Sequence, residues 1–239
     1  MKEKMLELNR RFANAPTEEV LDWFVGEYEG KIAFSTSLGA EDQVITRMIA
    51  DAQLPVQVFT LDTGRLFQET YDLLDITVGK YGIPIRIYFP EPAHVEEMVA
   101  AKGVNLFYES VENRQLCCHI RKIEPLKRAL SGMEVWITGM RKDQSVTRTG
   151  ADLVEWDSSN QILKLNPLIR WSNDQVWDYI RKWQVPVSEL HAKGFPSIGC
   201  LPCTRAVQPG EDIRAGRWWW ENPASRECGL HKRHEGSGR

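Results

Sequence analysis

The chain has 239 residues, of which 42% are hydrophobic and 26% are charged, and its formal net charge is −3. This length suits one α/β domain with an elaborated end, and this composition excludes a disordered chain. The slightly acidic balance gives no overall attraction to nucleic acid or to an anionic membrane, so we expect neither as a partner. An anionic substrate would need a local basic pocket.

Four short apolar strands alternate with helical patterns in the first 140 residues. Strands are expected at 31–36, 56–61, 83–88 and 135–138, and helices at 41–51, after Thr63-Gly64 and at 120–130. This alternation predicts an α/β fold with a mainly parallel sheet flanked by helices. Ligands of such sheets bind beyond the carboxyl ends of the strands, where the loops 35–42, 62–65 and 139–148 fall.

The pattern weakens from residue 151 onward. A hairpin is expected up to residue 165. A helix is expected after it, with Ser172 or Asn173 as its N-cap and its end at about Trp183. Regular periodicity disappears after His191. We therefore expect an irregular C-terminal tail that closes over the site.

The loop Ser35-Thr36-Ser37-Leu38-Gly39-Ala40-Glu41-Asp42 joins a strand to a helix through small residues. Its amides and hydroxyls suit an anion at a helix N-terminus. An ordinary turn with Ser37 as the helix cap fits the same sequence, and this alternative stays open. The loop is not a Walker A loop, because no Gly-Lys-Ser/Thr follows.

Five cysteines are present, and their number is odd. The first twenty residues contain no uninterrupted apolar run, and no later run reaches the length of a membrane span, so we expect a cytoplasmic protein with reduced thiols. The cysteines are then interpreted as ligands or catalysts. If four of them bind one metal centre, one thiol is left for chemistry.

Two thiol pairs stand on separate segments, Cys117-Cys118 and Cys200-Leu201-Pro202-Cys203. Four thiolates can bind a zinc ion or an iron–sulfur cluster. Adjacent cysteines chelate one small ion awkwardly, whereas a cubane spreads its iron corners, so the pattern favours the cluster. A dithiol redox pair at Cys200 and Cys203 is a further alternative, which leaves the first pair unexplained.

Basic residues gather in sequence around these pairs: Arg121, Lys122, Arg141, Lys142, Arg148, Arg205, Arg214 and Arg217. As a group they suit phosphate or sulfate, although a solvated surface charge is the simpler role for each one. Cys228 is the unpaired thiol, and the nearby Arg226, His231 and Lys232 favour its thiolate. On spacing alone, a tail cysteine without a chemical role remains the simpler interpretation.

Six blocks in order resemble the thioredoxin-dependent adenylyl sulfate (APS) and phosphoadenylyl sulfate (PAPS) reductases, and within them the cluster-bearing bacterial branch. The blocks are residues 61–64 (LDTG), 117–126 (CCHIRKIEPL), 138–144 (TGMRKDQ), 196–204 (PSIGCLPCT), 216–218 (GRW) and 227–231 (ECGLH). The resemblance implies an adenine-nucleotide alpha hydrolase-like fold with a modified phosphate-binding loop. It also implies a sulfonucleotide-binding domain at 1–205 that carries the cluster, and a mobile active-site tail of the same domain at 206–239.

The resemblance further implies a role for each matching residue. Four cysteines would bind a four-iron four-sulfur (4Fe-4S) cluster: Cys117, Cys118, Cys200 and Cys203. Lys122 would lie between cluster and substrate, Cys228 would be the nucleophile, and His231 would assist it. The remaining residues would bind the sulfonucleotide: Ser35, Ser37, Gly39, Leu61, Gly139, Arg148, Arg214 and Arg217.

The implied reaction is the reduction of APS to sulfite and AMP in sulfate assimilation. It would pass through an S-sulfocysteine on Cys228, which reduced thioredoxin resolves. A PAPS or dual-substrate reductase is the alternative. An ATP-dependent sulfurtransferase and a zinc-binding interaction module are more distant ones, and the sequence leaves a homo-oligomer open.

Overall fold

The apolar strands form one sheet in the computed structural model, which describes residues 2–144 and 150–222. Within this described part the strand order is β3-β2-β1-β4-β6-β5. Four strands run parallel to one another: β1 (Ile32–Ser35), β2 (Gln57–Leu61), β3 (Ile85–Tyr88) and β4 (Val135–Ile137). β1 pairs with β2 on one side and with β4 on the other, and β2 pairs with β3. β6 (Ile162–Leu165) pairs in parallel with β4, and β5 (Val154–Asp157) runs antiparallel at the edge. The predicted α/β fold, its four strands and its hairpin are confirmed.

Eight α-helices occur in the described residues: α1 (Lys2–Arg11), α2 (Thr17–Glu27), α3 (Ala40–Asp51), α4 (Gln68–Tyr81), α5 (Pro92–Lys102), α6 (Val111–Cys118), α7 (Glu124–Ala129) and α8 (Asn173–Trp183). A π-helical turn at His119–Ile123 joins α6 to α7. Shorter 3-10 turns occupy Leu106–Tyr108, Lys142–Gln144, Glu189–Lys193 and Leu201–Cys203. The sequence predicted α3, α4, α7 and α8, whereas α1, α2, α5 and α6 were not predicted.

The two faces of the sheet are both buried, as expected for parallel strands that helices cover. Ile32 and Phe34 of β1 join the larger core, which includes residues of α2, α3 and α8. Ala33, between them, faces the other way and joins a smaller core with Leu126 and Ala129 of α7. The sheet is therefore a packed layer between two sets of helices.

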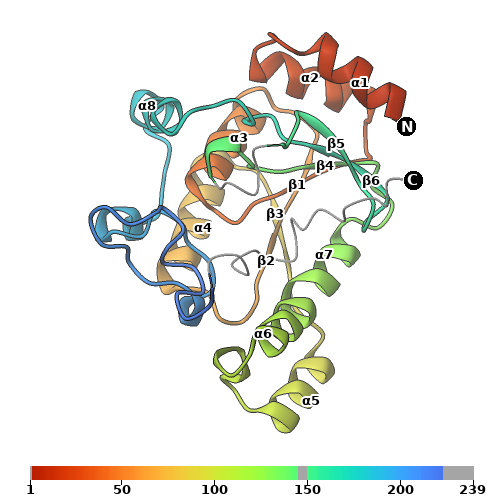
Figure 1. The fold of residues 1–239 in the computed structure, drawn as a ribbon. Coiled ribbons are helices and arrows are strands. Elements are labelled where there is room, and N and C mark those ends of the chain that lie inside the picture. The colour runs from red at the N-terminus through yellow and green to blue at the C-terminus, as the bar shows by residue number, and fades with distance from the viewer. Residues whose placement is uncertain (1, 145–149, 223–239) are drawn as a thin grey trace.

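A third core lies at the end of the molecule opposite to α1 and α2, where α5 and α6 extend away from the sheet (Figure 1). Its buried members are Met98, Leu106, Phe107, Cys117, Ile120, Cys203 and Trp218. Two segments far apart in sequence thus meet here, the one that carries the first cysteine pair and the one that carries the second.

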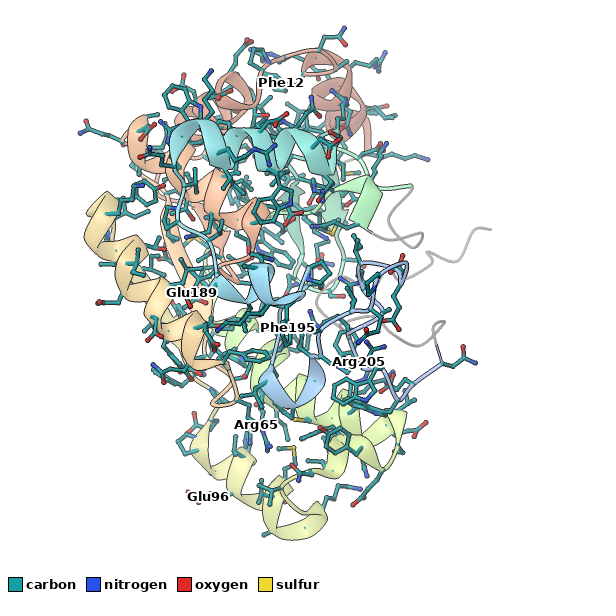
Figure 2. All side chains as sticks on the ribbon, turned by 90° about the vertical axis from the view of Figure 1, so that its left-hand side faces the viewer. Phe12, Arg65, Glu96, Glu189, Phe195 and Arg205 are labelled. Carbon is teal, nitrogen blue, oxygen red and sulfur yellow. The ribbon has the colours of Figure 1, made fainter. Side chains whose placement is uncertain are left out.

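The chain after α8 connects these parts. Figure 2 shows it running from Glu189 past Phe195 to Arg205 between α8 and the α5–α6 end, with Arg65 close below. The Phe195 ring packs against Phe67 at 5.7 Å, and the Leu201 amide donates to the Arg65 carbonyl at 2.8 Å. The second cysteine pair is thereby fixed to the loop that follows β2.

No helix in residues 2–144 and 150–222 is long and apolar enough to cross a membrane.

Candidate active site

A cavity of about 340 Å³ opens at the carboxyl ends of the central parallel strands. Ser35 ends β1, Leu61 ends β2 and Thr138 directly follows β4, and all three line this cavity. Of the predicted substrate-binding residues, seven line it: Ser35, Ser37, Gly39, Leu61, Gly139, Arg214 and Arg217. The structure therefore brings together, in one place, residues that the sequence resemblance assigned to one ligand.

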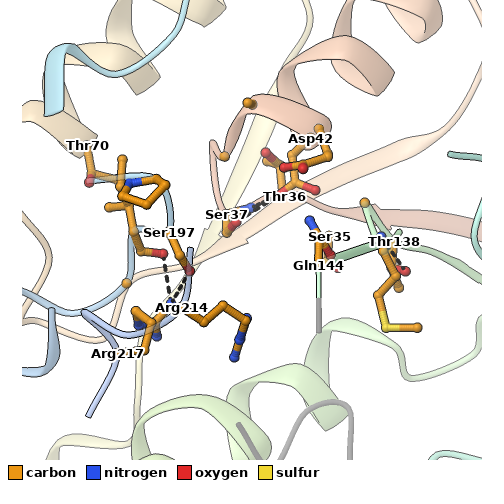
Figure 3. A pocket seen from close by; sticks show the side chains of 18 of the residues that line it. Ser35, Thr36, Ser37, Asp42, Thr70, Thr138, Gln144, Ser197, Arg214 and Arg217 are labelled. Atoms are coloured by element: carbon orange, nitrogen blue, oxygen red, sulfur yellow. Dashed lines mark hydrogen bonds between the residues drawn. The ribbon is translucent and has the colours of Figure 1, made fainter. Parts of the chain in front are cut away.

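The serine-rich loop is held in shape by a buried carboxylate. Asp42 accepts hydrogen bonds from the Ser37 amide at 2.6 Å and from the Ser37 hydroxyl at 2.7 Å (Figure 3). Leu38 takes a positive φ of 60°, and its amide donates to the Thr36 hydroxyl at 3.0 Å. Gly39 is the cap residue of α3, so the interpretation of Ser37 as the helix cap is wrong.

Gly139 lies close to the same carboxylate. A Cβ atom at position 139 would come within 2.1 Å of Asp42 Oδ1 and within 3.3 Å of the Asp42 amide nitrogen. The end of β4 can therefore approach α3 only because residue 139 has no side chain. This contact closes one wall of the cavity.

Two arginines enter the cavity from the C-terminal segment. Arg214 and Arg217 lie across it from Ser35 and Thr138 (Figure 3). Arg217 is buried, and its Nη1 donates to the Ile198 carbonyl at 3.2 Å. Guanidinium groups in this position suit the oxygens of a phosphate or sulfate group.

A second, smaller cavity of about 20 Å³ lies beside the first. All four cysteines of the two pairs line it, together with Phe107, Pro202 and the basic residues Arg65, Arg114, Arg121 and Lys122. Four thiols and four cations thus surround one space. In the described residues, no three His, Cys, Asp or Glu side chains form a group that could hold a single metal ion.

A π-helical turn, His119–Ile123, directly follows the first cysteine pair and carries its basic neighbours Arg121 and Lys122. Single π-turns are rare in proteins, and many of those that occur lie at functional sites, because the widened turn shifts the direction of the side chains that follow it. Here Arg121 reaches the Thr63 carbonyl with its Nη1 at 2.6 Å. Lys122 lines both cavities, so this residue belongs to the wall that they share.

The basic residues act on the second cysteine pair. Burial raises the pKa of the Cys200 thiol, but the charge of Lys122, a hydrogen bond with Thr63 at 3.3 Å and the charge of Arg217 outweigh it and lower the pKa. For Cys203, burial and the neighbouring Cys200 raise the pKa to about 12. A thiol in such a place becomes a thiolate when a metal binds it. Four cysteines on one cavity with cations around them therefore fit a thiolate-bound cluster.

Residues 31–206 match the phosphoadenosine phosphosulfate reductase domain family. An adenosine 5'-phosphosulfate reductase of Allochromatium vinosum is 54% identical over 202 residues, which cover 84% of this chain and 79% of that protein. The chain belongs to this reductase family. The family resemblance that the six sequence blocks predicted is confirmed.

Solved structures agree with the fold of a phosphoadenosine phosphosulfate reductase. The crystal structure of phosphoadenylyl-sulfate reductase from Candida auris, a phosphate complex, has a TM-score of 0.75 and 31% identity, and it covers 87% of this chain and 98% of that one. FMN adenylyltransferase from Candida glabrata, in complex with FAD and pyrophosphate, has a TM-score of 0.57 at 14% identity, covering 93% and 78%. The second likeness concerns the fold alone. The predicted adenine-nucleotide alpha hydrolase-like fold is confirmed.

Three predicted site residues of this reductase-family chain, Arg148, Cys228 and His231, lie outside the described residues. Their roles stay predictions, as do the boundaries of the 206–239 tail.

Arg141 is buried, whereas a solvated surface position was the simpler expectation for it. It is 1% exposed, and its Nε donates to Glu41 Oε1 at 2.8 Å. Its guanidinium therefore joins the loop after β4 to the first turn of α3.

The sequence reasoning missed other residues of the site. Asp42 and Arg65 were noted only as the ends of loops, and Arg114 was not considered. Arg65 directly follows the Thr63-Gly64 block after a strand, which is a signal that points to a site residue. Arg114 has no comparable local signal, because it stands in a helix that the periodicity did not predict.

Proposed function

We propose that this chain reduces adenylyl sulfate to sulfite and AMP, with Cys228 as nucleophile and reduced thioredoxin as electron donor. The observation that carries the proposal is the pair of adjoining cavities. One presents a serine-rich loop, strand-end backbone and two arginines, as a sulfonucleotide needs, and the other presents four cysteines. The 54% identity to an enzyme named adenosine 5'-phosphosulfate reductase supports the choice of substrate.

In the first step the Cys228 thiolate attacks the sulfur of the phosphosulfate. The bond between that sulfur and the bridging oxygen breaks, AMP leaves with the electron pair, and an S-sulfonate remains on Cys228. Arg214, Arg217 and Lys122 line the cavity, and in this proposal they neutralise charge on the phosphate and sulfuryl oxygens. His231 stands three positions beyond Cys228, where it assists the thiolate.

In the second step a thioredoxin thiolate attacks the Cys228 sulfur, and sulfite leaves. The second thioredoxin thiol then attacks the mixed disulfide, so that Cys228 returns to the thiol and thioredoxin leaves as a disulfide. The two electrons that reduce the sulfur thus come from the dithiol. This chemistry requires reduced thiols, which supports a cytoplasmic location for the protein.

A 4Fe-4S cluster on Cys117, Cys118, Cys200 and Cys203 would supply local structure and charge. Thiolate ligands from positions 117–118 and 200–203 tie the α6 region to the segment that follows α8. Lys122, in the wall between the two cavities, would contact both sides. No step of the reaction needs a change in the oxidation state of iron.

A PAPS reductase is the second candidate, because the phosphate complex that resembles this chain is a phosphoadenylyl-sulfate reductase. The two substrates differ by the phosphate on the ribose 3′-oxygen. Parallel assays of the purified protein with APS and with PAPS separate the candidates, and we expect the larger kcat/KM with APS.

Mass spectrometry of the intact protein tests the nucleophile. After addition of APS without thioredoxin we expect one sulfonate adduct on Cys228, which disappears when reduced thioredoxin is added. The Cys228→Ser variant should bind AMP as the unchanged protein does and form no adduct. An adduct or sulfite release from this variant would show that another residue is the nucleophile.

Metal analysis tests the second cavity. We expect about four iron and four sulfide per chain. One zinc without sulfide would instead support a structural zinc site and contradict the cluster.

A further inference from the structure

Arg114 and Glu221 form an ion pair that is shut off from solvent. Arg114 Nε lies 2.8 Å from Glu221 Oε1, and Arg114 Nη2 lies 2.8 Å from Glu221 Oε2. The two side chains are 1% and 2% exposed. They stand 107 positions apart, Arg114 in α6 and Glu221 near the end of the described chain.

Such a pair is a poor device for general stability. Removing two charges from water costs solvation free energy, which offsets much of the free energy gained from their attraction. Apolar residues of similar size often stabilise a protein equally well. A bidentate geometry does fix the relative position of the two segments that it joins. What those segments carry therefore indicates what the pair does.

On one side the pair reaches the four-cysteine cavity. Arg114 lines this cavity and stands one helical turn before Cys117 and Cys118. The guanidinium of Arg114 thus pairs with Glu221, and the same residue forms part of the wall around the four cysteines.

On the other side the pair holds the segment that leads to Cys228. The Glu221 amide donates to the Trp218 carbonyl at 2.8 Å, and the Trp218 amide donates to the Cys203 carbonyl at 3.1 Å. The Trp218 ring is 1% exposed and lies 4.9 Å from the Arg114 guanidinium carbon. Residues 217–221 are therefore packed against α6 and against the second cysteine pair together.

We propose that the Arg114–Glu221 pair is a positioning device that couples the four-cysteine site to the placement of the chain that carries Cys228. This inference rests on the proposed role of Cys228. An extended chain spans about 3.5 Å per residue, so an anchor at Glu221 keeps Cys228 within about 25 Å of it. Without the pair, Glu221 is held less firmly, and the packing of the Trp220 ring on Tyr108 at 4.5 Å becomes the last anchor before Cys228. The tether to Cys228 is then longer and its start is less fixed, so the effective concentration of Cys228 at the substrate falls.

The Glu221→Gln variant breaks the pair, because the amide keeps the shape of the side chain and removes its charge. With saturating APS we expect the rate of adduct formation on Cys228 to fall about 1.5-fold or more, while the KM for APS stays within about twofold. Hydrogen exchange, which needs no substrate, should show faster exchange at both 114–118 and 217–221 and unchanged exchange in β1 and β4. Glu211→Gln is the matched control, since Arg205 and Glu211 form a bidentate pair at 2.8 Å that is one-third exposed and lies outside both cavities.

A double variant, Arg114→Met with Glu221→Met, leaves no stranded buried charge and decides the case if Glu221→Gln does not fold. For this double variant we expect the same fall in the rate of adduct formation on Cys228 and the same faster hydrogen exchange at both 114–118 and 217–221. A wild-type rate in either variant, a wild-type exchange pattern, or loss of protection in only one of the two segments overturns the proposal. If the unchanged protein forms no adduct at all, the proposed nucleophile is wrong, whereas the exchange measurement still decides the coupling.

Discussion

Ser37 and Gly139 lie in two loops far apart in the sequence, yet the carboxylate of Asp42 contacts both. Asp42 binds the Ser37 amide and hydroxyl with Oδ2, while its Oδ1 occupies the space where a side chain at position 139 would stand. The carboxylate cannot rotate away from position 139 without releasing Ser37. The shape of the serine-rich loop therefore depends on a glycine about 100 positions away.

This dependence predicts the effect of Gly139→Ala. The added methyl group displaces Asp42, the loop loses two hydrogen bonds, and the sulfonucleotide loses a wall of its cavity. We expect the KM for APS to rise about tenfold, which corresponds to about 1.4 kcal/mol of binding free energy, with a folded protein by circular dichroism.

Gly79→Ala is the control for this prediction. Gly79 is exposed in α4, and nothing lies within 4 Å of a Cβ atom at that position. We expect an unchanged KM and an equal or slightly higher melting temperature, because alanine favours a helix. An unchanged KM for Gly139→Ala would mean that the loop tolerates the shift of Asp42.

The sequence predicted the residues that line the larger cavity better than it predicted the contacts that hold those residues in place. Ser37 and Gly139 could be proposed because strand ends and family blocks mark them. The Asp42 contact with position 139 and the Arg114–Glu221 pair could not, because contacts across about 100 positions leave no periodic signal in either segment. Cys228 shows the same limit, since its chemistry follows from the family blocks and not from its neighbours in sequence.

Among the helices, the bounds of α8 were predicted most closely, because the sequence at its start contains a recognisable N-cap. Ser172 accepts a hydrogen bond from the Gln175 amide at 3.2 Å, and the Gln175 side chain accepts one from the Ser172 amide at 2.8 Å, which together form a capping box. The first two turns that follow supply Asn173 and Trp177 to the cavity wall. The capping signal at Ser172 thus also helps to position two residues of the candidate site.

We expect Ser172→Ala to destabilise the protein by about 1 kcal/mol, because an amide of the first turn loses its partner. For a chain of this size the melting temperature should fall by about 2–4 °C. Thermal unfolding followed by circular dichroism measures the change. Ser158→Ala, at an exposed turn position between β5 and β6, should leave the melting temperature unchanged. Equal melting temperatures for both variants would show that α8 is held by its packing alone.

Other elements could not be predicted for physical reasons. α5 shows little separation of apolar and polar residues, and only Met98 of its side chains is buried. The π-helical turn at His119–Ile123 falls inside a stretch whose 3.6-residue pattern predicts a continuous helix. Arg121 in this turn donates to the Thr63 carbonyl in the loop after β2, a contact that the local sequence does not show.

At the scale of the whole molecule, the large core and the cysteine-bearing core differ in what holds them. The large core packs helices α2, α3 and α8 against the sheet. The core around Cys117 and Cys203 has seven buried members, and it joins segments that are more than 80 positions apart. A metal link that closes so long a loop contributes more to stability than a local one.

Removal of iron should therefore affect one end of the molecule. Without the cluster, Arg65, Arg114, Arg121 and Lys122 line a cavity that has lost much of its negative charge, and their mutual repulsion opposes closure. We expect chelation to raise hydrogen exchange at 98–120 and 200–218, while β1, β2 and β4 keep their protection. The Cys228→Ser protein should respond as the unchanged protein does, because Cys228 is not a cluster ligand in the proposal. Uniform loss of protection would mean that the cluster stabilises the whole fold, and no loss would mean that the seven-residue core holds by itself.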